Sequence, residues 1–93
     1  PAVEHDLAIV VDNSVTCEDL ERRITSAGGK LLEGVRLFDV YRDPVRIGKG
    51  KKSMAFALTY RSDDHTLTSE EVEKAHQKIV TKVCKGVNGE VRG

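Results

Sequence analysis

The sequence has few of the residues that mark specialised classes of protein. Its 93 residues include no Trp, two Cys, two Pro and only 4% aromatic residues. No apolar run approaches the ~20 residues of a membrane span, and nothing resembles a signal peptide. With only one possible bridge we expect no disulfide framework, and Cys17 and Cys84 are expected to be partly buried on two helices in a reducing cytosol.

A net charge is also absent, since 15 Lys and Arg residues balance 15 Asp and Glu residues. A neutral chain argues against nucleic-acid binding, for which a basic domain is the usual expectation. The distribution along the chain changes this interpretation. Residues 36–61 contain seven basic and two acidic residues, which gives this segment a charge of +5 and leaves −5 for the remainder. The neutral average therefore hides a polarised domain.

Features of an active site are missing as well. His5, His65 and His76 are scattered over an N-terminal arm, a loop and a helix face, with no nucleophile or carboxylate at a useful spacing. The chain has no phosphate-binding loop, metal-ligand spacing or nucleophile elbow. We expect no catalytic residue, no metal site and no cofactor in this chain, and we expect His76 on the second helix as a residue at the boundary between its buried and exposed faces.

The hydrophobic pattern alternates between the period of a strand and that of a helix. One helix is expected between Thr16 and Gly28 and another between Thr68 and Gly86, each with a Thr N-cap and an acidic residue three positions later. Residues 43–51 contain a Pro and two Gly and are expected to form a loop. Strands are expected at residues 6–12, 35–42, 52–61 and about 87–92.

This order predicts a single α+β domain over residues 1–93. Two right-handed crossovers give a ferredoxin-like βαββαβ sandwich, in which a four-stranded antiparallel sheet carries both helices on one face. Nothing in the chain covers the other face, which we call the open face, and we expect the function there. Because the chain starts at Pro1 without Met, we also expect a processed product or a piece of a larger protein.

Side-chain alternation along the strands assigns residues to the two faces. In the second strand Phe38 and Val40 suit the core, which places Leu37, Asp39 and Tyr41 on the open face. The bulky residues of the first and third strands are expected to face the helices: Leu7, Ile9, Val11, Met54, Phe56, Leu58 and Tyr60.

The open face beside the loop could bind a nucleobase. Tyr41 offers a ring for stacking, Asp39 accepts hydrogen bonds from base amino or imino groups, and Ser53 donates or accepts them. The other interpretation is that Tyr41 covers its strand neighbours and that Asp39 and the basic loop are merely solvated. Basic residues in and around the loop could hold phosphates: Arg42, Arg46, Lys49, Lys51, Lys52 and Arg61.

Two other families with this element order fit less well. An RNA-recognition motif needs exposed aromatic residues on its first and third strands. Here the first strand has none, and Phe56 alternates with the core set. An acylphosphatase-like enzyme needs a glycine-rich anion loop after the first strand, where this chain has Asp12 and Asn13.

Several longer motifs carry a resemblance to a known family. They are LFDVYR at 37–42, GKKSMAFALTY at 50–60, TLT at 66–68, the opening PAVEHDLA and the closing VRG. With these motifs the sequence resembles the C-terminal ferredoxin-fold anticodon-binding domain of the bacterial phenylalanyl-tRNA synthetase β subunit, over essentially all 93 residues.

The resemblance implies a binding module of a larger cytoplasmic enzyme with no membrane partner. In that family the enzyme is an (αβ)₂ assembly whose α subunit uses ATP and Mg²⁺ to charge tRNA, and this domain of β contacts the anticodon loop of tRNA(Phe). By motif position the stacking tyrosine is Tyr41, its acid Asp39 and the family's serine Ser53. Ala57 and His5 stand where many members carry a polar or basic residue, so one open-face contact and one possible phosphate partner of the family are missing here.

A second hypothesis stays open beside this one. A ferredoxin-like module that mediates protein interaction or binds an amino acid as a regulator would share the same element order. It predicts a stable dimer or a ligand-induced stabilisation, and little response to salt.

Overall fold

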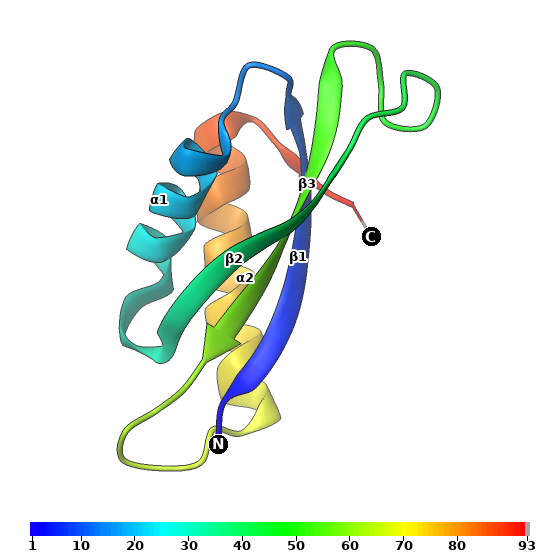
Figure 1. Ribbon diagram of the computed structural model, residues 1–93. Coiled ribbons are helices and arrows are strands. Elements are labelled where there is room, and N and C mark those ends of the chain that lie inside the picture. Colours follow the sequence, from blue (N-terminus) through cyan, green and yellow to red (C-terminus); the bar gives the residue numbers. More distant parts are fainter. Residues whose placement is uncertain (93) are drawn as a thin grey trace.

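A computed structural model describes residues 1–92, so Gly93, the last residue of the closing motif, lies outside the described residues. Figure 1 shows one sheet with both helices against the same face. The predicted ferredoxin-like α+β fold is confirmed. In chain order the elements are β1 (Val3–Asp12), α1 (Cys17–Gly28), the 3₁₀ helix η1 (Gly29–Leu31), β2 (Leu32–Tyr41), β3 (Lys51–Tyr60), α2 (Ser69–Val87) and β4 (Glu90–Val91).

The sheet is antiparallel, with the strand order β2-β3-β1-β4. β1 and β3 pair over their full length and form its centre. β4 is shorter than predicted because α2 continues through Gly86 and ends at Val87. Asn88 then adopts the left-handed conformation (φ 54°), and its N–H donates to the carbonyl of Cys84. Asn tolerates this conformation, so the predicted helix end at Gly86 was wrong by one residue.

The core lies between the helices and the helix-facing side of β1 and β3. The predicted core residues of β1 and β3 are all buried, and Cys17 and Cys84 are partly buried on the helices as expected. Thr68 and Glu71 form the predicted capping box of α2. The core side chains with no exposed surface are Ile9, Val11, Leu20, Ile24, Phe56, Leu58, Tyr60 and Ile79.

A β-bulge in β2 overturns part of the predicted alternation. The register with β3 shifts between Leu37 and Asp39, so Phe38 is the extra residue. Leu37 pairs with a helix-facing residue of β3 and packs against the core, whereas Asp39 pairs with an open-face residue. Phe38 and Val40 are 48% and 38% exposed. The assignments of Phe38 to the core and of Leu37 to the open face were therefore wrong. Val40 pairs with Met54 on the helix-facing side, as predicted, but it is exposed there and does not belong to the core.

Two histidines pack together on the helix-facing side. His76 is buried and does not lie at the predicted boundary between the buried and exposed faces of its helix, and its Nδ1 lies 2.8 Å from the Tyr60 hydroxyl. The His5 ring stacks on that of His76 with the centroids 3.9 Å apart. Burial raises the pKa of Tyr60 to about 12, and burial together with the neighbouring His5 lowers the pKa of His76. His5 is thus engaged with the helix layer.

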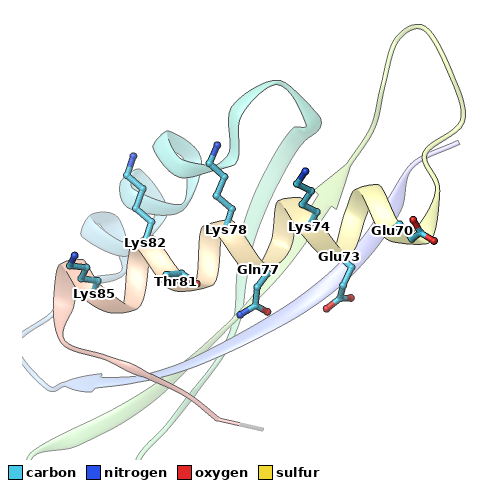
Figure 2. A pocket seen from close by; sticks show the side chains of 8 residues that line it. All are labelled: Glu70, Glu73, Lys74, Gln77, Lys78, Thr81, Lys82 and Lys85. Atoms are coloured by element: carbon cyan, nitrogen blue, oxygen red, sulfur yellow. The ribbon is translucent and has the colours of Figure 1, made fainter.

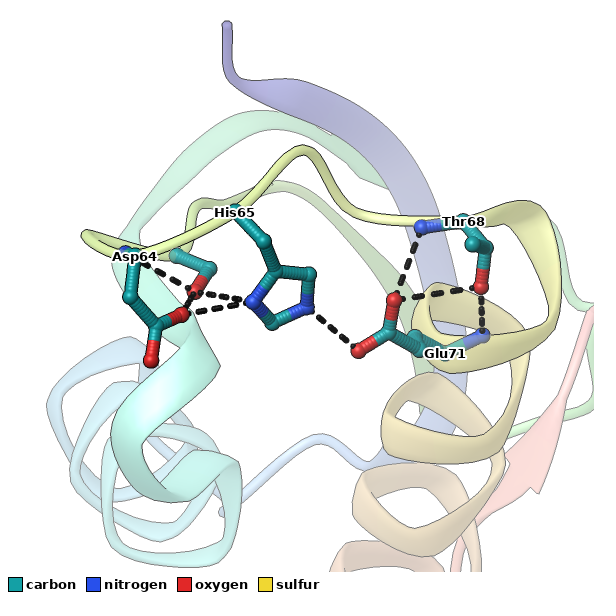
Figure 3. Close-up of polar contacts among 5 residues, drawn as sticks. Asp64, His65, Thr68 and Glu71 are labelled. Atoms are coloured by element: carbon teal, nitrogen blue, oxygen red, sulfur yellow. Dashed lines mark hydrogen bonds and ion pairs between the residues drawn. The ribbon is translucent and has the colours of Figure 1, made fainter.

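The loop between β3 and α2 is attached to the helix through His65 (Figure 3). Its Nε2 lies 2.8 Å from Glu71 Oε2 and its Nδ1 lies 2.6 Å from Asp64 Oδ1. Glu71 also receives the backbone N–H of Thr68, so one carboxylate serves both the loop and the helix cap. Hydrogen bonds to Glu71 and Asp64 raise the pKa of His65 above its ordinary value of 6.5.

This contact predicts a pH-dependent contribution to stability. A raised pKa in the folded state means that the contribution is fully present below pH 6.5 and is lost as the pH rises through the folded value. We expect His65→Gln to lower Tm below pH 6.5 and the difference from the wild type to shrink at higher pH. Thermal melts of both proteins across this range measure it. The lowered pKa of His76 contributes to stability with the opposite pH dependence, but His76 is present in both proteins, so its contribution cancels in the comparison. A difference in Tm that does not change with pH would contradict the prediction.

Candidate nucleic-acid interface

The register brings three of the predicted residues together on the open face. Tyr41 on β2 pairs with Ser53 on β3, and Ser53 pairs with Val10 on β1. Paired residues project to the same side of a sheet, and Asp39 occupies the next row, opposite Ala55. Asp39, Tyr41 and Ser53 therefore form one cluster at the end of the sheet where β2 and β3 are joined.

Tyr41 is held on both its hydroxyl and its ring. The hydroxyl donates to Asp43 Oδ2 at 2.9 Å, which raises the pKa of Tyr41. The guanidinium carbon of Arg92 lies 4.6 Å from the ring centroid, a cation–π geometry. The ring remains half-exposed. Its orientation is thus fixed before any ligand arrives.

Arg92 is the residue of this cluster that the sequence analysis missed as a site residue. Its backbone N–H donates to the carbonyl of Ala8 on β1, while Tyr41 lies two strands away on β2. The two side chains must therefore meet above the central strands, and Ser53, which lies between them in the sheet, is only 2% exposed. The one signal in the sequence that pointed to Arg92 was the closing VRG motif. This motif contributed to the family resemblance, but it gave Arg92 no role in binding.

The loop between β2 and β3 is organised by Asp43. Its carboxylate accepts the backbone N–H groups of Val45 and Arg46 at 3.0 and 3.1 Å, and the bond from Arg46 is the main reason that the pKa of Asp43 is lowered. At the base of the loop, Arg42 Nε donates to Asn13 Oδ1 at 3.2 Å. Arg42, Arg46 and Lys49 are exposed on a loop that is tied to the rest of the fold.

The other three basic residues that were predicted to hold phosphates do not all lie on the exposed loop. Lys51 is half-exposed and pairs with Asp12 in the sheet. Lys52 is 7% exposed and is paired with the core residue Val11, on the helix-facing side. Arg61 lies beyond the far end of β3, about 27 Å along the strand from Ser53, where it forms an ion pair with Glu33 at 3.2 Å. Lys52 and Arg61 do not join the cluster.

Residues 1–92 lack two features that would point to other kinds of function. None of the helices there combines the length and the apolar character needed to cross a bilayer. Within the same residues, no three His, Cys, Asp or Glu side chains are grouped so that they could hold a metal ion.

Comparisons with known proteins identify the family of this chain. A family model described as the ferredoxin-fold anticodon binding domain matches residues 1–92. The chain is 46% identical over 92 residues to a protein of Clostridium tetani and 50% identical over 80 residues to one of Bacillus subtilis, both named phenylalanine–tRNA ligase beta subunit. These alignments cover 99% and 86% of this chain but only 12% and 10% of the relatives. The chain therefore belongs to the ferredoxin-fold anticodon-binding domain family.

Proposed function

We propose that this chain binds the anticodon loop of tRNA(Phe) as the C-terminal module of a phenylalanine–tRNA ligase β subunit. The observation that carries the proposal is the cluster of Tyr41, Asp39 and Ser53 beside a basic loop. It joins a stacking ring, base-directed acceptors and phosphate-binding side chains on one surface. The names of the relatives and the family favour this reading over an amino-acid-binding or protein-interaction module.

The mode of binding follows from the contacts of the Tyr41 ring. Arg92 covers one face of the ring, so a base stacks on the opposite face. Asp39 is exposed and accepts a hydrogen bond from the base edge. Ser53 is buried, so it contacts RNA only after the side chains above it move. Arg92 therefore acts as a support for the ring in the free chain.

Phosphates are held by the exposed basic residues of the loop. Arg42, Arg46 and Lys49 belong to this set, with Lys51 at its edge. These contacts fix the position of the RNA without reading its sequence. Lys52 and Arg61 are left out of the proposed interface because one is buried towards the helices and the other is paired at the far end of the sheet.

The rest of the parent protein supplies the chemistry. In this proposal an α subunit in an (αβ)₂ assembly uses ATP and Mg²⁺ to activate phenylalanine and charge the tRNA in the cytoplasm. This domain contributes the anticodon contact. The chain spans about a tenth of the length of the relatives it matches, which fits one module of a much longer subunit.

A titration of the 93-residue chain with an anticodon stem-loop of tRNA(Phe), at two salt concentrations, tests the proposal. We expect amide chemical-shift changes in β2, β3 and their loop, and an affinity that falls as salt rises. The control is the same stem-loop with its three anticodon bases replaced, which should bind more weakly. Equal binding of the two stem-loops, or changes confined to α1 and α2, would contradict it. A stable dimer with no response to salt would favour the regulatory module.

A further inference from the structure

A row of lysines lies on the outer side of α2, on the helix layer and away from the open face. Lys74, Lys78 and Lys82 follow one another at four-residue intervals, and Lys85 continues the row. Figure 2 shows the first three projecting in the same direction. All four are exposed, and none forms an ion pair within residues 1–92.

The basic surface continues onto the neighbouring elements. Lys82 lines a hollow together with Arg22 and Arg23 of α1, and Lys74 and Lys78 line another together with Lys30 of η1. One acid, Asp19, forms ion pairs with both arginines, and Glu18 and Glu21 line a further hollow of α1 together with Arg22.

Within α2 (residues 69–87), acidic residues interrupt this surface only near the start of the helix. Glu70 and Glu73 line the same part of the helix as the lysines, and Glu73 projects away from their row (Figure 2). The charge of −5 outside residues 36–61 is therefore unevenly distributed, because the groove between the helices is basic.

From this arrangement we infer that the lysine row binds the phosphodiester backbone of RNA, independently of base sequence. This is a second RNA contact, distinct from the proposed anticodon interface. The helices cover one face of the sheet and the Tyr41 cluster lies on the other. A single hairpin loop cannot contact both faces. The lysine row therefore binds a different segment of the same RNA, or a second RNA molecule.

The chemistry of the row favours an RNA backbone over a protein. Four-residue steps along a helix give a rise of about 6 Å between successive ammonium groups, which forms a line of positive charge. Lysine is a flexible point charge that binds phosphate without fixed geometry. No aromatic or large apolar side chain lines the hollow along the row itself, and Leu31 is the one large aliphatic residue lining the hollow beside Lys30. Protein interfaces depend on such anchors and are poor in Lys, and base reading requires stacking or edge contacts.

The test uses the 93-residue chain with Lys74, Lys78 and Lys82 all changed to Gln, and a fluorescent oligouridylate that lacks the anticodon sequence. Anisotropy gives the affinity at several salt concentrations. For single-stranded RNA, each lost phosphate contact makes the negative slope of log K against log salt shallower by about 0.7. We therefore expect the slope of the triple Gln variant to be shallower by about 2. The corresponding triple Lys→Arg variant keeps the charge and should keep the slope. Circular dichroism confirms that each variant is folded.

The two RNA proposals fail separately. Tyr41→Ala should leave oligouridylate binding to the lysine row unchanged, and the triple Gln variant should still discriminate between the anticodon stem-loop and its control. An unchanged salt slope in the triple Gln variant would overturn the inference. It would also be overturned if polyglutamate of equal charge displaced the oligouridylate as effectively as unlabelled RNA, because the face would then be a site for an acidic protein.

Discussion

Replacing Tyr41 with Ala should weaken binding of the anticodon stem-loop roughly 5- to 150-fold in Kd, the range observed for loss of one base–aromatic stack. The substitution removes the ring on which the base stacks and leaves Arg92 without its cation–π partner. The residue lies at an edge of the sheet and is half-exposed, so the fold should survive. Isothermal titration of the 93-residue chain measures the change.

Tyr41→Phe is the matched control. It keeps the ring and removes only the hydroxyl that donates to Asp43. We expect an affinity close to that of the wild type, because stacking needs the ring and the Asp43 carboxylate still accepts two backbone N–H groups. In the proposed parent ligase, amino-acid activation should be the same for both variants. The stacking assignment fails if Ala binds as well as Tyr, or if Phe loses as much as Ala.

The second large effect concerns stability. Phe56→Ala should lower the free energy of unfolding by about 3–5 kcal/mol, as is typical when a large buried aromatic side chain is removed. Phe56 lies in the middle of β3 and is fully buried. Small domains have only about 5–15 kcal/mol in total, so the variant should unfold at a much lower urea concentration. Urea denaturation followed by circular dichroism gives the value.

Phe38→Ala removes the same atoms from the β-bulge. Phe38 is 48% exposed, so we expect a loss below about 1 kcal/mol. The comparison therefore separates burial from residue type within one protein. If the two variants lost similar amounts of stability, Phe38 would belong to the core and the bulge would be misplaced.

The fold could be predicted because its signals are local. A Thr followed three residues later by an acid marks the start of each helix, and the strands show period-2 patterns. The bulge could not be predicted, because Leu37 and Phe38 are both large and apolar and either could face the core. Which of them does so depends on the register with β3, which is a contact between distant segments.

Some residues of the candidate site could be predicted from the sequence and others could not. Asp39 and Tyr41 lie after the bulge, where strict alternation holds again, so their predicted face agrees with the register. Lys52 was included from a charge count that ignored which face of β3 it occupies. Arg92 was missed because its contact with Tyr41 depends on the strand order, which places the C-terminal strand beside β1.

The direction of β1 has a practical consequence for any binding assay. β1 begins opposite Tyr60 and ends opposite Lys51, so the N-terminus lies at the end of the sheet far from the β2–β3 loop (Figure 1). The molecule is 45 Å long and less than half as wide. A biotin or sensor surface attached through Pro1 would therefore present the loop outward. The same attachment just beyond Arg92 would crowd the Tyr41 ring and produce a spurious loss of RNA binding.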